Sequence, residues 1–125
     1  MSLQVKVSKQ KEGYFVVTLN GRLDSQSTPL CEGHLQPVLS GAARVVVLDL
    51  SLLDYISSMG LRLLLKARQT LTAQNAHLIL TNLQPQIAKV FEIAQALPPQ
   101  TIFASQAEAD HYLDVMQRRA REQKI

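Results

Sequence analysis

The spacing of apolar and polar positions predicts five strands. Residues 3–10 ("LQVKVSKQ") alternate with a period of two, as in a half-buried strand, and residues 14–21 ("YFVVTLNG") predict a second strand. The short turn between them indicates an antiparallel hairpin. Residues 44–50 and 77–83 are nearly continuous apolar runs, which are typical of parallel strands buried on both faces by helices. A fifth, short strand is predicted at residues 101–105.

Helical spacing predicts a first helix after the hairpin. This helix should begin at Pro29 behind a Ser27 or Thr28 cap, because proline is favoured in the first helical turn. Gly33 and Pro37 both weaken a helix, so we expect it to be short or kinked. Its expected buried side chains are Leu30, Cys31, Leu35, Val38 and Leu39.

Three further helices are predicted. One runs from Ser58 to about Ala73, the next opens at Pro85, and the last is capped by Ser105. Their apolar positions recur at three- and four-residue intervals, which places each set on one face. The expected buried side chains are Leu61, Leu64, Leu65 and Leu71; then Ile87, Val90, Phe91 and Ala94; then Ala109, Tyr112, Leu113, Met116 and Ala120.

The resulting order, ββαβαβαβα, predicts the fold class. We expect a single α/β domain over residues 1–125, with a mixed β-sheet covered by about four helices. An antiparallel hairpin at the N-terminus should lead into parallel βαβ units. A length of 125 residues suits one domain with one core.

Composition and charge point to an ordinary globular protein of the cytoplasm. Apolar residues make up 46% and charged residues 18%, and the net charge is +3. The basic cluster near the C-terminus suits the negative end of a helix dipole. It comprises Arg118, Arg119, Arg121 and Lys124. Nucleic-acid binding would favour aromatic residues among these basic ones, and there are none, so we expect no nucleic-acid partner. Cys31 is the only cysteine, so no intrachain disulfide can form. Neither a signal peptide nor a membrane span is apparent, so we expect no membrane insertion.

The motifs of common enzymes are missing from the sequence. There is no glycine-rich phosphate loop and no G-x-S-x-G elbow. His34, His77 and His111 lie far apart without metal-ligand spacing, and His77 is expected at the surface. We therefore predict no enzyme activity, no metal and no cofactor.

The adjacent serines Ser57 and Ser58 stand where the helix of residues 58–73 begins. One serine is enough to cap that helix, and a cap stabilises by about 1 kcal/mol. The other lies near the positive end of the helix dipole, where a phosphoryl group would add about −1.5 to −2 charges. From the residues alone, capping and a charge-controlled switch both remain open. The switch requires the Ser58 hydroxyl to be exposed to solvent.

Three segments together resemble the STAS-domain anti-sigma factor antagonist family. They are "GRLDSQST" (21–28), "VVVLDLSLLDYISSMGLRLLL" (45–65) and "LILTNLQPQIAKVFEIAQALP" (78–98). Aligned on Gly60 and Leu61, the resemblance implies that Ser58 is the family's phosphoacceptor. Ser57 stands in place of the motif's aspartate, and Met59 in place of its serine or threonine.

The resemblance implies a regulatory binding protein. Its partner would be an anti-sigma factor that is also a serine protein kinase, which releases its sigma factor on binding. Phosphorylation of Ser58 would break this complex, and Asp24 could partly substitute for the missing carboxylate. Met59 could be an exposed contact or part of the core. The implied docking residues are Asp24, Ser57, Ser58, Met59, Gly60 and Arg62.

Two alternatives remain beside that interpretation. A STAS domain that is not phosphorylated could act as a docking module of a transporter or a signalling scaffold, with the serines serving only as a cap. A hydrolase that uses Ser58 is the least supported, because no base or oxyanion motif accompanies the serine. The sequence predicts no particular oligomeric state, sigma factor or signal.

Overall fold

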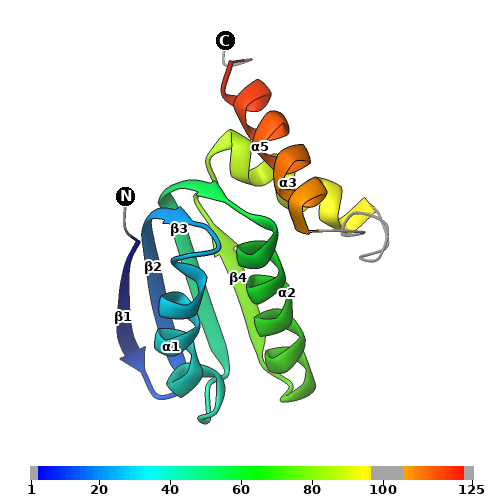
Figure 1. Cartoon of the computed structure of the whole chain (residues 1–125). Coiled ribbons are helices and arrows are strands. Elements are labelled where there is room, and N and C mark those ends of the chain that lie inside the picture. The colour runs from blue at the N-terminus through cyan, green and yellow to red at the C-terminus, as the bar shows by residue number, and fades with distance from the viewer. Residues whose placement is uncertain (1–2, 97–105, 123–125) are drawn as a thin grey trace.

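The structure is a computed structural model and describes residues 3–96 and 106–122. Along these residues, four strands and four helices follow one another in the order ββαβαβαα (Figure 1). The strands are β1 (Gln4–Lys11), β2 (Tyr14–Leu23), β3 (Val45–Ile56) and β4 (His77–Thr81). The helices are α1 (Thr28–Leu39), α2 (Ser58–Ala73), α3 (Pro85–Ala96) and α5 (Gln106–Glu122).

The four strands form one mixed sheet in the order β1-β2-β3-β4. β1 pairs with β2 in an antiparallel hairpin, whereas β2 with β3 and β3 with β4 are parallel. Each parallel connection contains a helix, α1 or α2, as a parallel crossover requires. The predicted fold class, a hairpin followed by parallel βαβ units, is therefore confirmed. The strand predicted at 101–105 lies outside the described residues.

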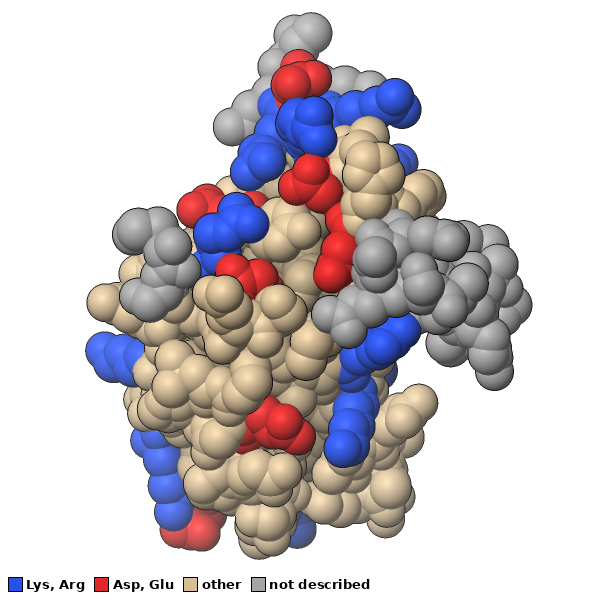
Figure 2. All heavy atoms as spheres, in the orientation of Figure 1, with Lys and Arg blue, Asp and Glu red and all other residues tan. Residues whose placement is uncertain are grey.

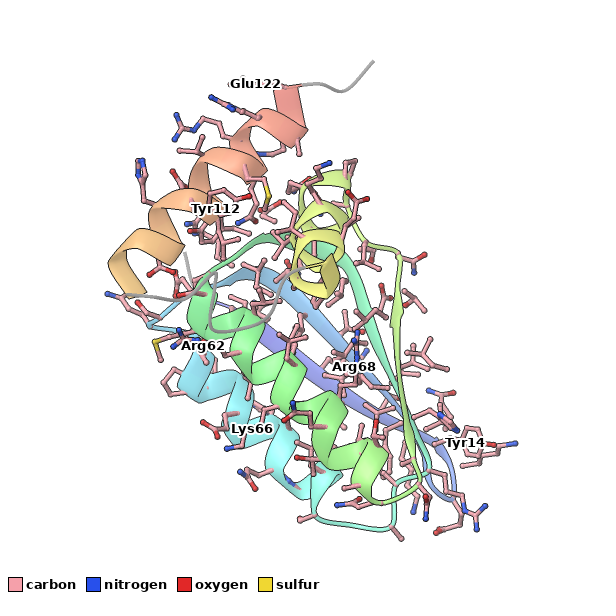
Figure 3. All side chains as sticks on the ribbon, turned by 90° about the vertical axis from the view of Figure 1, so that its right-hand side faces the viewer. Tyr14, Arg62, Lys66, Arg68, Tyr112 and Glu122 are labelled. Carbon is pink, nitrogen blue, oxygen red and sulfur yellow. The ribbon has the colours of Figure 1, made fainter. Side chains whose placement is uncertain are left out.

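Helices α1 and α2 lie side by side on one face of the sheet, and α3 and α5 lie beyond the end of the sheet (Figures 1 and 3). The core fills the space between the sheet and α1 and α2, and extends to α3 and α5. Within the described residues, no helix combines the length and the apolar character that a membrane span requires. Fully buried core side chains include Leu19, Leu23, Leu35, Leu48, Leu50, Leu61, Leu64, Leu71, Ile87 and Leu113.

The prediction that the parallel strands are buried on both faces is wrong. Alternate residues of β3 face away from α1 and α2, and Val45 and Val47 are only half-buried there. Ile79, paired with Val47 in β4, is 44% exposed. An apolar run therefore does not require two covered faces, because β-branched residues also suit a partly exposed pleated surface.

The predictions that Leu30 and Tyr112 are buried in the core are also wrong. Leu30 is 48% exposed because the buried side of α1 is formed by Thr28, Cys31, Leu35 and Val38. Burial raises the pKa of the Cys31 thiol to about 12, and the Glu32 carboxylate adds to this rise. α1 begins one residue before Pro29 and continues for 12 residues through both Gly33 and Pro37.

On α5, Tyr112 is 48% exposed, against the prediction of a buried stripe, whereas its neighbour Leu113 is buried. Met116 and Ala120 are half-buried. The reason is that the packed face of α5 follows residues 110, 113 and 117, and this line does not include Tyr112.

β2 and β3 are longer than predicted and end side by side. The sequence places the end of β3 at residue 50, but the strand continues to Ile56, which pairs with Leu23 at the end of β2. Two irregularities in the pairing, at Thr18/Asn20 and Gly21/Arg22, allow this extension. Gly21 has a φ of 118°, a backbone conformation that favours glycine. The loop after β2 and the start of α2 therefore leave the sheet together.

Candidate functional site at the start of α2

Ser57 is the N-cap of α2. Its backbone is extended, with φ −90° and ψ 175°, and its side-chain oxygen accepts a hydrogen bond from the Gly60 N–H at 3.2 Å. The Ser57 N–H donates to the Leu23 carbonyl at 2.8 Å, which attaches the helix start to the end of β2. The Ser57 side chain is buried. One of the two serines therefore serves the fold as a cap, as the sequence suggested.

Ser58 is the first residue of α2 and is completely buried, at 0% exposure. Its hydroxyl donates to the Asp110 Oδ1 atom at 2.7 Å, and its backbone N–H donates to the same oxygen at 2.9 Å. The expectation of an exposed hydroxyl is therefore wrong in this conformation. The predicted position at a helix N-terminus is correct, but a carboxylate from α5 occupies the place where a charged ligand would approach.

A second polar contact holds α5 against the end of β3. Gln117 is completely buried, and its side-chain oxygen accepts from the Ile56 N–H at 3.0 Å. Its Nε2 donates to the Ile56 carbonyl at 2.8 Å. Gln117 thus pairs with both backbone groups of a strand residue two positions before Ser58. Figure 3 shows α5, with Tyr112 labelled, beyond the end of α2 that carries Arg62.

Asp24 organises the loop between β2 and α1. Its Oδ1 accepts from the Gln26 and Ser27 N–H groups, each at 3.0 Å. The Ser27 hydroxyl accepts from the Asp24 N–H at 2.9 Å and donates to the Arg22 carbonyl at 2.6 Å. Partial burial works against ionisation, but the hydrogen bonds from Ser27 and Gln26 and the nearby Arg22 hold the pKa of Asp24 below its usual value. Ser27 therefore serves this loop, and its side chain does not cap α1.

The carboxylate beside Ser58 is Asp110, not Asp24. Within residues 3–96 and 106–122, the Asp24 carboxylate accepts hydrogen bonds only from Gln26 and Ser27 of its own loop. Tyr55, three residues before Ser58, is also close to the α5 carboxylates. Burial raises the pKa of Tyr55, and Asp114 and Asp110 raise it further, while Arg22 opposes the rise. The Arg22 guanidinium lies 4.1 Å from the centre of the Tyr55 ring.

The predicted docking residues differ in exposure. Arg62 is exposed, and Asp24 and Met59 are half-buried, so Met59 lies between the two alternatives considered for it. Gly60 is buried, like Ser57 and Ser58. The part of the predicted docking face that reaches solvent in this conformation is therefore formed by Asp24, Met59 and Arg62.

The sequence interpretation missed Asp110 and Gln117. Both are polar, and a search for apolar positions passes over them. They lie seven residues apart with Leu113 between them, which is the i, i+3, i+7 spacing of one helical face. Two polar residues that flank a buried leucine on one face were the available signal. Figure 2 shows charged side chains of both signs gathered over α5 at the top of the view, so this part of the surface is not uniformly basic.

Comparison with known proteins identifies the family. The family model described as STAS domain matches residues 6–109. The chain belongs to the STAS domain family. The three segments quoted above, and the hairpin with its parallel βαβ units, are therefore features of a STAS domain in this chain.

The relatives of this STAS domain include anti-sigma factor antagonists. BtrV of Bordetella bronchiseptica, named as a proposed anti-sigma factor antagonist, is 37% identical over 83 residues, which cover 66% of this chain and 72% of BtrV. The fold also matches the unphosphorylated anti-sigma factor antagonist SpoIIAA, with a TM-score of 0.63 at 23% identity over 72% of this chain and 83% of that one. A sulfate transporter family protein from Wolinella succinogenes matches with a TM-score of 0.52 at 17% identity, over 87% and 91% of the two chains.

Proposed function

We propose that this STAS domain is an anti-sigma factor antagonist whose association is controlled by phosphorylation of Ser58. The observation that carries the proposal is that the two serines have different structural roles. Ser57 supplies the helix cap, so the Ser58 hydroxyl is not needed to start α2. Because Ser58 is buried against Asp110, phosphorylation requires a state in which Asp110 no longer covers this hydroxyl. Similarity to BtrV supports the antagonist role, and SpoIIAA, which shares the fold, has also been described in a phosphorylated form.

The proposed partner is an anti-sigma factor that is also a serine protein kinase. Its docking face would comprise Asp24, Met59 and Arg62 at the surface, and Ser57, Ser58 and Gly60 beneath. In the transfer step, the Ser58 oxygen bonds to the γ-phosphorus of a nucleoside triphosphate. The bond to the bridging oxygen breaks, nucleoside diphosphate leaves, and the hydroxyl proton passes to a base of the kinase. The added charge then opposes rebinding by repulsion and by its desolvation cost.

One observation favours a second candidate function. Because Ser58 is buried against Asp110, the domain could also serve as a docking module that is not phosphorylated, for example in a transporter assembly. Affinity purification of the tagged protein from its own cells distinguishes the two functions. Recovery of a kinase-type anti-sigma factor supports the antagonist, whereas recovery of transporter subunits supports the docking module.

Ser58→Ala should abolish phosphorylation by the anti-sigma kinase of the same organism. We expect the wild type to gain one phosphoryl group with ATP, measured by intact-protein and peptide mass spectrometry. Ser57→Ala is the matched control: it weakens the cap by about 1 kcal/mol but keeps the acceptor, so it should still be modified. Phosphate that persists in Ser58→Ala and maps to Ser57 or Thr28 would show that the acceptor is assigned wrongly.

A further inference from the structure

Helix α5 covers Ser58 through a single carboxylate oxygen. The Asp110 Oδ1 atom accepts two hydrogen bonds, one from the Ser58 hydroxyl at 2.7 Å and one from the Ser58 N–H at 2.9 Å. Asp110 is separated from Ser58 by 52 positions along the chain, so this contact depends on how α5 packs. It satisfies one unpaired N–H at the start of α2 and places a negative charge at the positive end of that helix.

Two polar contacts and one apolar contact hold one face of α5 against the end of β3 and the start of α2. Gln117 pairs with both backbone groups of Ile56, Leu113 is buried between, and Asp110 binds Ser58. Residues 110, 113 and 117 follow one side of α5, while residues 56 and 58 lie two positions apart across the junction of β3 and α2. The Gln117 contact involves only backbone groups of Ile56, so a change at the Ser58 oxygen acts directly on the Asp110 contact alone.

We propose that Asp110 controls access to Ser58, so that docking of α5 and phosphorylation of Ser58 exclude each other. This inference rests on the proposed function in one respect, namely that a phosphoryl group is transferred to Ser58. While Asp110 accepts the hydroxyl, the oxygen is buried and a kinase cannot reach it. Once the oxygen is esterified, it has no proton to donate to Asp110, and two anionic groups would stand where one hydrogen bond stood. The phosphorylated protein therefore has its α5 helix released from the start of α2.

Release of α5 changes the surface that partners meet. The docked state buries Ser58 at the start of α2. Loss of the Asp110 contact exposes Ser58 together with the first turn of α2. A partner could therefore distinguish the two states by the covering helix as well as by the phosphoryl charge. Asp110 has the role of a positioning residue, because it acts by holding the Ser58 hydroxyl and the helix that carries it.

Amide hydrogen exchange on the full-length protein tests the proposal without a kinase. In Asp110→Ala, the Ser58 N–H loses its acceptor, and exchange at the α2 start and along α5 should rise about tenfold. Asp114→Ala is the matched control, because it removes a carboxylate one turn further along α5 that pairs with Arg118 on the surface. This control should leave exchange at Ser58 unchanged. Equal exchange in Asp110→Ala and in the wild type would overturn the proposal.

A second pair of variants imitates the charge at the acceptor. Ser58→Asp should release α5, with exchange as fast as in Asp110→Ala, because two carboxylates would face each other. Adding Asp110→Asn supplies an amide that donates to the new carboxylate, so the double variant should return close to wild-type exchange. Protected β3 amides verify folding in each case. A double variant at least as open as Ser58→Asp would overturn the proposal even if Asp110→Ala fails to fold.

The kinase reaction separates this inference from the proposed function. If access is limited by Asp110, Asp110→Ala should be phosphorylated at Ser58 several-fold faster than the wild type, while Asp114→Ala should match the wild type. No modification of Ser58 in any variant would end the proposed function, and the exchange results would still decide whether Asp110 holds α5. Equal phosphorylation rates in all three proteins would overturn the control of access.

Discussion

Replacing Gly60 by alanine is expected to destabilise the protein by about 2 kcal/mol, although alanine is the better helix former. A Cβ atom at this position would lie 2.7 Å from the Leu23 Cγ atom and 2.8 Å from the Leu23 carbonyl oxygen. Leu23 is completely buried, and its carbonyl accepts the Ser57 N–H. The added methyl group therefore pushes against the backbone contact that attaches the start of α2 to β2.

Gly33→Ala is the matched control for this substitution. Gly33 also lies within a helix, but a Cβ atom built there meets nothing within 4 Å. This variant should gain about 1 kcal/mol from helix propensity alone. Urea denaturation of both variants measures the difference. The explanation fails if both substitutions shift the free energy of unfolding in the same direction. The close approach of Leu23 would then not account for a requirement for glycine at position 60.

The second large effect is expected for Gln117→Ala, which should cost about 2–4 kcal/mol. Truncation leaves the buried Ile56 N–H and carbonyl without their side-chain partners, and each unsatisfied group costs about 1–3 kcal/mol, partly offset by relaxation. Removing these bonds also loosens α5. Exchange at the α5 amides should therefore rise in the same variant, which links the stability loss to the helix that covers Ser58.

Gln74→Ala supplies the comparison for Gln117. Gln74 also donates from Nε2 to a backbone carbonyl, that of Leu39 at 3.0 Å, but it lies on the surface. Water can replace that bond, so the loss should stay below about 1 kcal/mol. Thermal or urea unfolding measures both variants. Equal losses would mean that the Gln117 contact adds nothing beyond an ordinary surface hydrogen bond.

Local patterns were sufficient to predict most of the fold. The alternation of residues 3–10, the apolar run of residues 44–50 and the serines before residue 59 each act within a few positions, and the structure contains the corresponding strands and helix start. The end of β3 could not be predicted in this way. Its continuation to Ile56 depends on pairing with the irregular end of β2, where Gly21 adopts its positive φ.

The candidate site was predicted in position but not in environment. Capping is a local property, so Ser57 and Ser58 could be placed at a helix start from the sequence alone. Burial of Ser58 depends on Asp110, 52 positions away, and the placement of α5 depends on Gln117, 61 positions from Ile56. Helical periodicity predicts which face of α5 is apolar, but it carries no information on which distant backbone groups a polar side chain will reach.

Together, these contacts suggest why the two neighbouring serines differ in function. Ser57 is required by the helix it caps, whereas among residues 3–96 and 106–122 the Ser58 hydroxyl hydrogen-bonds only to Asp110, on a separate helix. A modification at Ser58 can therefore move α5 and leave the cap of α2 in place.

The most direct test of control through Ser58 is a calorimetric titration of the proposed partner, an anti-sigma kinase of the same organism, with the full-length protein before and after phosphorylation. If Ser58 governs association, the unphosphorylated protein will bind, and the form phosphorylated at Ser58 will bind at least about tenfold more weakly, a loss of about 1.4 kcal/mol. Equal dissociation constants for the two forms would contradict control at this serine.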